Sequence, residues 1–232
     1  MRRLNPVCKF FGILATAVVL SLFYVPMLNL GVFAACLLAA ACSRVPLRHA
    51  CAILLPALLI AVGMFFSAYH FSADTAMGAH SGMFTDARVW NGLLLAGRLM
   101  GFAGLGMLFT LTTNQIDFIR ALNTQLKLPA RFAYGIIAAW GMFPRMAREY
   151  SKTRSSFRAR GLRAGFVSPA LLLPLLVKSV RWSESMAVAM ESKGFGETDT
   201  RSHYYEFRAK AADIAFAVLA PAAVVMAGVW LG

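Results

Sequence analysis

Two short stretches of the sequence share one pattern, a cation followed directly by a glycine after a helix-forming segment. The first is Ala159-Arg160-Gly161 and the second is Ser192-Lys193-Gly194, with their cations 33 positions apart. A cation in the last turn meets the negative end of the helix dipole, and glycine adopts the left-handed conformation that ends many helices. The pattern therefore has a purely structural explanation. It also suits two positive side chains presented to acidic grooves on a partner with two subunits.

The sequence shows no machinery for catalysis. It contains no phosphate-binding GxxxxGK[ST] loop and no HExxH, GxSxG or CxxC pattern. The histidines are scattered, and we expect His70 and His80, with Asp74 and Asp86, to be solvated loop residues rather than metal ligands. We therefore predict a protein that is not an enzyme on its own and that binds neither a metal ion nor a cofactor directly.

Arg98 is the one charged residue between Gly92 and Leu111, in an otherwise apolar stretch. An arginine inside a membrane span is costly and often marks a functional site. However, Arg98 lies only six residues from Gly92, so its long side chain can reach the membrane interface. We expect a structural role.

The composition indicates a membrane protein. Of the 232 residues, 59% are hydrophobic and the mean hydropathy is +0.64, whereas a soluble fold needs a polar surface. The net charge is +13. In a soluble domain this excess would suggest nucleic-acid binding, but basic residues also gather in the cytoplasmic loops of membrane proteins. We expect a lipid bilayer, and no nucleic acid, as a partner.

The first apolar segment, Phe10 to Cys42, has 33 residues. One helix of that length would measure about 50 Å, beyond a hydrocarbon core of about 30 Å, and the segment is too long for a signal peptide. Pro26, Asn29 and Gly31 lie at its middle and favour a turn. Because basic residues flank both ends, two short spans with a cytoplasmic N-terminus satisfy the positive-inside rule.

Three further apolar segments predict spans at about Ala50–Phe71, Gly92–Leu111 and Ala211–Leu231. Ser72–Asn91 carries few charges and is typical of an external loop. Glycines spaced by three and four residues predict a close-packing face on the fourth span: Gly97, Gly101 and Gly104.

The region between Thr113 and Lys210 is different, because it holds 16 of the 23 basic residues and seven of the ten acidic ones. We predict an all-α polytopic membrane protein with three parts: four spans in 1–112, basic cytoplasmic amphipathic helices in 113–210, and a fifth span in 211–232. Prolines and capping residues predict four helices in the middle part: Gln115–Leu126 with Asn114 as N-cap, Pro129 to about Phe143, Pro144 to Gly161, and Ala170–Lys193.

Several motifs lie in or near this middle part: Leu111-Thr112-Thr113, Asp117-Phe118-Ile119-Arg120-Ala121-Leu122, Leu128-Pro129, Phe143-Pro144-Arg145, Arg158-Ala159-Arg160-Gly161 and Ala187-Val188-Ala189-Met190-Glu191-Ser192-Lys193-Gly194-Phe195. Together they resemble the T component of energy-coupling factor (ECF) transporters, the CbiQ/EcfT family. Thr200-Arg201 and Asp213 also fit. The resemblance covers about Leu111 to Asp213, and the N-terminal spans agree only in hydropathy.

This resemblance implies a multi-pass, energy-coupling subunit of an ATP-driven importer in a bacterial or archaeal plasma membrane. In the family, two cytoplasmic ATP-binding subunits, identical or different, bind the ATP. A small membrane protein, the S component, binds the substrate, which is a vitamin or a transition-metal ion such as cobalt or nickel. The region 113–210 would then hold the coupling helices, which transmit the ATPase movement to the S component.

The family's two Ala-Arg-Gly elements dock onto the two ATPases. Ala159-Arg160-Gly161 matches the first element fully, whereas Ser192-Lys193-Gly194 matches the second only at its glycine. Lysine keeps the charge but lacks the planar, bidentate fork of arginine, so we expect a less specific second contact. Ala139-Trp140-Gly141 also lacks the arginine that the family pattern leads us to expect there.

Apolar residues of the coupling helices could form the sliding surface for the S component, with ordinary packing in the bundle or the membrane as the alternative: Phe132, Tyr134, Ile136, Ile137, Leu171, Leu172, Leu175 and Leu176. Three other functions are weighed against the coupling role. A substrate-translocating membrane subunit of another ABC-type importer would need a polar cavity, but the spans are nearly devoid of polar residues. An intramembrane enzyme would need paired catalytic groups, and a nucleic-acid-binding membrane anchor would use the basic region.

Overall fold

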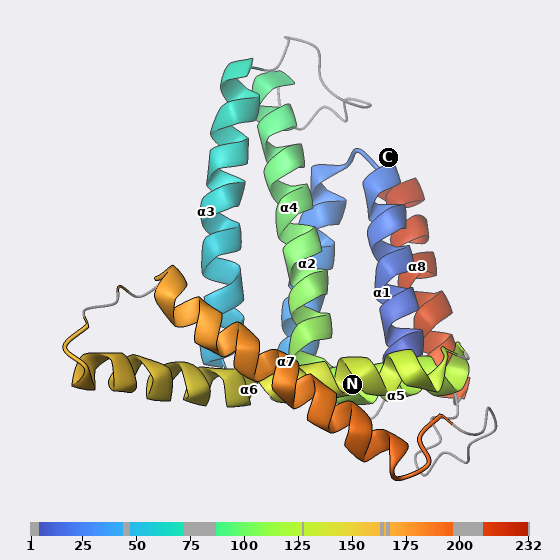
Figure 1. The fold of residues 1–232 in the computed structure, drawn as a ribbon. Helices are drawn as coiled ribbons and strands as arrows, with labels where there is room; N and C mark the ends of the chain where they lie inside the picture. The colour runs from blue at the N-terminus through green and yellow to red at the C-terminus, as the bar shows by residue number, and fades with distance from the viewer. Residues whose placement is uncertain are drawn as a thin grey trace. The chain divides into compact units, whose positions relative to one another are not determined.

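The computed structural model describes residues 5–43, 47–71, 87–126, 128–162, 165, 168–196 and 211–231. All regular structure in these residues is helical, which confirms the all-α fold class (Figure 1). The helices are α1 (Pro6–Leu22), α2 (Pro26–Cys42), α3 (Leu47–Phe71), α4 (Ala87–Thr112), α5 (Gln115–Gln125), α6 (Ala130–Ala159), α7 (Pro169–Glu191) and α8 (Ala211–Leu231).

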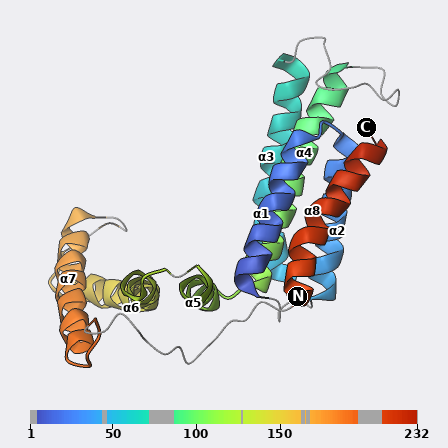
Figure 2. The same ribbon diagram turned by 90° about the vertical axis from the view of Figure 1, so that its right-hand side faces the viewer.

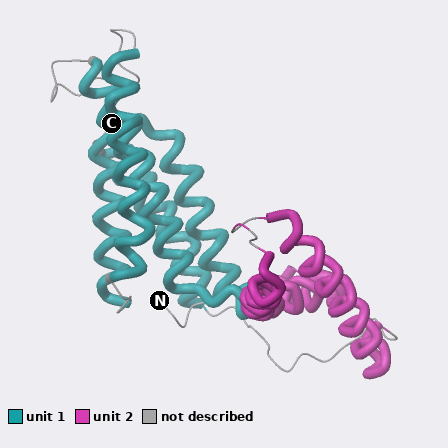
Figure 3. The backbone as a smooth tube through the Cα atoms, turned by 60° about the vertical axis from the view of Figure 1, so that its left-hand side comes forward, with its two compact units in different colours: residues 1–121, 207–232 teal, residues 122–206 magenta. Residues whose placement is uncertain are grey.

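The chain forms two compact units (Figure 3). Unit 1 combines Met1–Ala121 with Phe207–Gly232, and unit 2 is Leu122–Glu206. The last helix, α8, therefore belongs with the first four although unit 2 separates them in the sequence. The predicted division of the sequence at residues 112 and 210 concerns membrane-spanning and cytoplasmic parts, and it stays a prediction.

In unit 1, helices α1 to α4 and α8 lie side by side, with α4 packed against both α2 and α3, and α1 against α8 (Figures 1 and 2). Among the described residues, three stretches are long and apolar enough to cross a membrane: Arg48–Phe71, Arg88–Thr112 and Ala211–Trp230. Helices α1 and α2 have 17 residues each, about 26 Å, which is near the lower limit for a span. The protein is thus membrane-embedded, while the five passes and the cytoplasmic N-terminus stay predictions.

The turn between α1 and α2 is shorter than the sequence suggested. Only Phe23–Val25 is non-helical, and Pro26 is the first residue of α2. Asn29 and Gly31 lie inside α2, so the expectation that they belong to the turn is wrong. One proline suffices here, because its fixed φ suits the first helical turn, where its missing N–H leaves no hydrogen bond unmade.

The glycine face of α4 confirms the predicted close packing. A Cβ atom added at Gly101 would lie 3.1 Å from Leu20 Cδ2, and one at Gly104 would lie 3.0 Å from Phe33 Cδ2. Gly97 is less tight, since its added Cβ would lie 3.6 Å from Asn29 Cβ. Small residues at these positions let α4 approach the α1–α2 hairpin closely.

Other helix boundaries confirm some predictions and correct others. Asn114 caps α5, since its Oδ1 accepts a hydrogen bond from the Ile116 N–H at 3.2 Å. The predicted external loop ended at Asn91, but α4 already begins at Ala87. The predicted break at Pro144 is also wrong, because α6 runs through it from Ala130 to Ala159 as one helix of 30 residues. An internal proline removes one hydrogen bond of the helix, and the bonds on either side maintain α6.

Candidate functional site

The first cationic end comprises residues 157–162, where α6 stops. Gly161 has φ +72°, and its N–H donates to the Arg158 carbonyl at 3.0 Å. The Leu162 N–H donates to the Phe157 carbonyl, also at 3.0 Å. This pair of bonds around a left-handed glycine is a Schellman motif, and it places Arg160 at the last position before the chain turns away.

The second cationic end comprises residues 190–195, after α7, and repeats this geometry. Gly194 also has φ +72°, and its N–H donates to the Glu191 carbonyl at 2.8 Å. The Phe195 N–H donates to the Met190 carbonyl at 3.0 Å. Lys193 thus takes the position that Arg160 holds at the first end. The two stretches singled out from the sequence have the same backbone geometry in the same register.

Contacts within unit 2 show that α6 and α7 run antiparallel. Toward the start of α6, the Tyr134 ring contacts the Phe195 ring with centroids 5.7 Å apart, and Arg131 donates to the Gly196 carbonyl at 3.3 Å. The second cationic end therefore lies beside the start of α6, and the first lies at the opposite end of this 30-residue helix (Figure 1). Arg160 lies 26 residues beyond Tyr134 along α6, so at 1.5 Å per residue the two ends are about 40 Å apart.

The two ends differ in burial. The cations Arg160 and Lys193 are both exposed. After them, Gly161 and Leu162 are exposed, whereas Gly194 and Phe195 are half-buried. Beside the second cationic end is an open hollow of about 590 Å³, lined by Arg131, Ala187, Met190, Glu191, Phe195 and Gly196. The second end is therefore braced against α6, a difference that the sequence did not reveal.

The charges around the ends also differ. The residue two positions before the cation is Arg158 at the first cationic end and Glu191 at the second, and both are exposed. At these matched positions the first end carries two positive charges, whereas Glu191 offsets Lys193 at the second. An acidic partner surface would therefore attract the first end more strongly.

The predicted sliding surface divides into exposed and buried residues. Leu171 is fully buried and Leu175 is 6% exposed, so these two residues do not offer a surface and their prediction is corrected. They occupy the covered side of α7, one turn apart. Ile137 is half-buried. The remaining predicted residues are exposed: Phe132, Tyr134, Ile136, Leu172 and Leu176.

Trp140 and Phe143, also exposed, were missed from the predicted surface. With Phe132 and Ile136 they follow the spacing i, i+4, i+8 and i+11, which puts all four on one face of α6. The rings of Trp140 and Phe143 contact each other, with centroids 5.8 Å apart. All four residues lie within the helix predicted from Pro129 to about Phe143, so their helical spacing would have identified Trp140 and Phe143.

Arg98 has the expected structural role, but it binds backbone carbonyls, whereas the sequence suggested that it reaches the membrane interface. Its Nη2 atom donates to the carbonyls of Ser21 and Phe23 at 2.8 and 3.1 Å, and its guanidinium lies 5.0 Å from the centre of the Tyr24 ring. The last carbonyls of a helix lack partners within the helix. Arg98 satisfies them at the end of α1 and so fixes the turn into α2.

Lys9 is a buried residue whose role the sequence did not indicate, because it appeared to be one of the flanking cations. It is 2% exposed, and its Nζ donates to Thr112 Oγ1 at 3.1 Å and to the Thr112 carbonyl at 3.3 Å. The neighbouring Phe10 ring packs on Phe109 and Phe118, with centroids 5.7 and 5.4 Å away. These contacts join the start of α1 to the end of α4 and to α5.

Within the described ranges no three His, Cys, Asp or Glu residues gather as a metal site would require. His80, Asp74 and Asp86, which were weighed as metal ligands with His70, lie outside the described residues. With an exposed cation at each turn, the two cationic ends offer recognition by charge and shape.

Known proteins resemble this chain over much of its length. A family model described as CbiQ, cobalt transport protein, matches residues 1–204. An energy-coupling factor transporter transmembrane protein EcfT from Staphylococcus aureus is 26% identical over 154 residues, which are 60% of this chain and 58% of that protein. A protein of the same name from Exiguobacterium sibiricum is 27% identical over 182 residues, 70% of this chain and 69% of that protein.

Proposed function

The chain belongs to the CbiQ family, which includes membrane components of energy-coupling factor transporters, and we propose that it is the energy-coupling subunit of such an importer. Two ATP-binding subunits would dock on it in the cytoplasm, and a small S component would bind the substrate in the membrane. The chain itself would bind no cofactor. The substrate would be a vitamin or a transition-metal ion, and the location a bacterial or archaeal plasma membrane, with the N-terminus inside.

One observation carries this proposal: the repeated geometry of the two cationic ends. Each places a cation directly before a left-handed glycine with φ +72°. The antiparallel arrangement of α6 and α7 separates the ends by about 40 Å. Two similar ends, held apart on one pair of helices, suit a partner that offers two similar acidic grooves. Ala159-Arg160-Gly161 and Ser192-Lys193-Gly194 are the proposed docking residues.

The mechanism follows from this arrangement. ATP binding would bring the two ATPases together and move the docked ends of α6 and α7. The exposed apolar residues of these helices would shift with them, and they are the proposed contact surface for the S component. Phe132, Ile136 and Leu176 are 67%, 48% and 60% exposed, so a partner can bury substantial apolar area on them.

Co-purification tests the proposal. The tagged chain, expressed with its neighbouring genes, should bring down two ATP-binding subunits and a small hydrophobic protein. The double variant Arg160→Ala, Lys193→Ala should lose the ATPases and keep the small protein. Arg148→Ala is the matched control, since Arg148 is an exposed arginine three turns before the first cationic end. Retention of the ATPases by the double variant would refute docking through these ends.

A further inference from the structure

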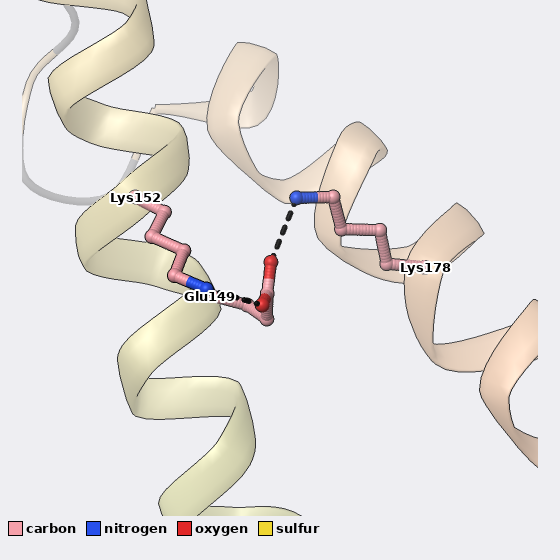
Figure 4. A network of polar contacts seen from close by, with 3 residues as sticks. All are labelled: Glu149, Lys152 and Lys178. Carbon is pink, nitrogen blue, oxygen red and sulfur yellow. Dashed lines mark hydrogen bonds and ion pairs between the residues drawn. The ribbon is translucent and has the colours of Figure 1, made fainter.

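Glu149 connects the two coupling helices at their crossing (Figure 4). Lys178 on α7 donates from Nζ to Glu149 Oε2 at 2.8 Å, and Lys152 on α6 lies 3.5 Å from Oε1. One turn earlier on α6, the Arg145 guanidinium lies 5.5 Å from the centre of the Trp182 ring. An ion pair and a cation–π contact thus join α6 and α7 at this crossing.

The Glu149 carboxyl stays charged under physiological conditions. The hydrogen bond from Lys178 holds its pKa below the ordinary value of 4.5, and the charges of Lys178 and Lys152 act in the same direction. The side chains of Glu149 and Lys178 are 28% and 50% exposed. An ion pair this exposed stabilises only weakly and is screened by salt. It can therefore break and form again within one transport cycle.

The contact between Glu149 and Lys178 lies many residues from both cationic ends, so a small rotation there produces a larger displacement of the ends. Arg160 lies 11 residues beyond Glu149 along α6, which is about 16 Å, and Lys193 lies 15 residues beyond Lys178 along α7, about 22 Å. A rotation of about 10° at the crossing would move the two ends by roughly 3 and 4 Å, given these lengths. Small changes at Glu149 thus become ångström-scale displacements of the two ends relative to each other.

We propose that Glu149 is a positioning residue: by bridging α6 to Lys178 it sets the crossing of α6 and α7, and thereby the position of the two cationic ends relative to each other. The effect of this residue on transport rests on the proposed function. The crossing itself can be measured without any partner, so the two ideas can fail separately.

The direct test measures the distance between spin labels near the two ends. Labels are placed at Ser156→Cys and Ala189→Cys, both exposed positions, in the full chain with its four native cysteines replaced. Glu149→Gln and Lys178→Gln should each raise the population outside the native distance range about two- to five-fold, as expected for loss of one exposed ion pair. Lys152→Gln should change it less, because Lys152 bridges only within α6. Glu184→Gln, an exposed acid on α7, is the control.

Distances that stay native in Glu149→Gln would overturn the proposal. An effect of Lys152→Gln equal to that of Lys178→Gln would also overturn it, since the carboxylate would then serve α6 alone. In the assembled transporter, Glu149→Gln should lower transport per ATP hydrolysed while the ATPases still co-purify. Unchanged transport per ATP would contradict the positioning role, whereas loss of co-purification in the Arg160 and Lys193 variants tests docking independently.

Discussion

The two cationic ends of unit 2 share a backbone and differ in their surroundings. Both are Schellman motifs with the glycine at φ +72° and the cation directly before it. The first is exposed and carries Arg158 with Arg160. At the second, Gly194 and Phe195 are half-buried, Phe195 contacts Tyr134, and the exposed Lys193 has Glu191 two positions before it. The two ends thus have the same backbone geometry, but their different charge and burial should make their contacts with a partner unequal.

This inequality has a physical meaning for a partner with two grooves. Arginine forms bidentate, charge-assisted hydrogen bonds, whereas lysine acts as a point charge. The first cationic end is therefore suited to strong, geometrically specific recognition. The second is held in place by its own helix pair, so its contact depends more on shape than on charge.

The largest effect is expected where the shared geometry is broken. A β-branched side chain is strained at φ +72°, so Gly161→Val and Gly194→Val should each disrupt one end and abolish docking there. ATPase co-purification measures this loss. Gly135→Ala is the control, because no atom lies within 4 Å of a Cβ added there. Normal docking in both valine variants would show that the left-handed glycines are dispensable.

The two cations should contribute unequally to transport. Arg160→Ala should abolish more transport than Lys193→Ala, because Arg160 offers the bidentate contact. Uptake of the substrate in cells, normalised to the amount of assembled complex, measures this order. Equal or reversed losses would mean that the two contacts are equivalent despite their different chemistry.

Charge at the matched positions should have a smaller effect. Glu191→Arg makes the second cationic end resemble the first and should strengthen ATPase binding a few-fold, while Arg158→Glu should weaken it by a similar factor. Both effects should shrink as the salt concentration rises. Binding measured at low and high ionic strength tests this, and an effect that is insensitive to salt would point to altered packing instead.

Loss of the contact between Phe195 and Tyr134 should affect only the backbone around the second cationic end. Phe195→Ala removes the ring contact with Tyr134, a type of contact that contributes about 1 kcal/mol. Amide hydrogens around Gly194 should then exchange faster. Leu162→Ala, the matched change at the exposed first end, should alter exchange little. The same acceleration at both ends would mean that they are equally braced.

The smallest effect is expected from pH. Because the pKa of Glu149 is lowered in the folded state, its contact contributes above the ordinary pKa of 4.5 and is lost as pH falls through the lowered value. The distance between labels at positions 156 and 189 should stay constant from neutral pH to about 4.5 and change only below it. In Glu149→Gln this pH response should be absent, and a response that persists would assign it to another group.

Much of the local structure followed from residue type and spacing. Asn114 capped α5 as predicted, because an N-cap depends on a few neighbouring atoms. The glycine face of α4 and the cation-glycine helix ends were also visible as short patterns. The motifs pointed correctly to the family. Each of these features depends on residues within a few turns of one another.

Contacts between distant residues decided the rest. Sequence reasoning ended a helix at Pro144, but α6 continues through it. It counted Lys9 as a flanking cation, but Lys9 is buried against Thr112, 103 residues away. It placed Leu171 and Leu175 on a partner surface, but the fold covers them. The sequence by itself determined that two helices end in a cation and a left-handed glycine. Only the tertiary structure, by pairing α6 with α7, decided that these ends lie about 40 Å apart and that one is braced, because burial and separation arise from contacts that no local pattern encodes.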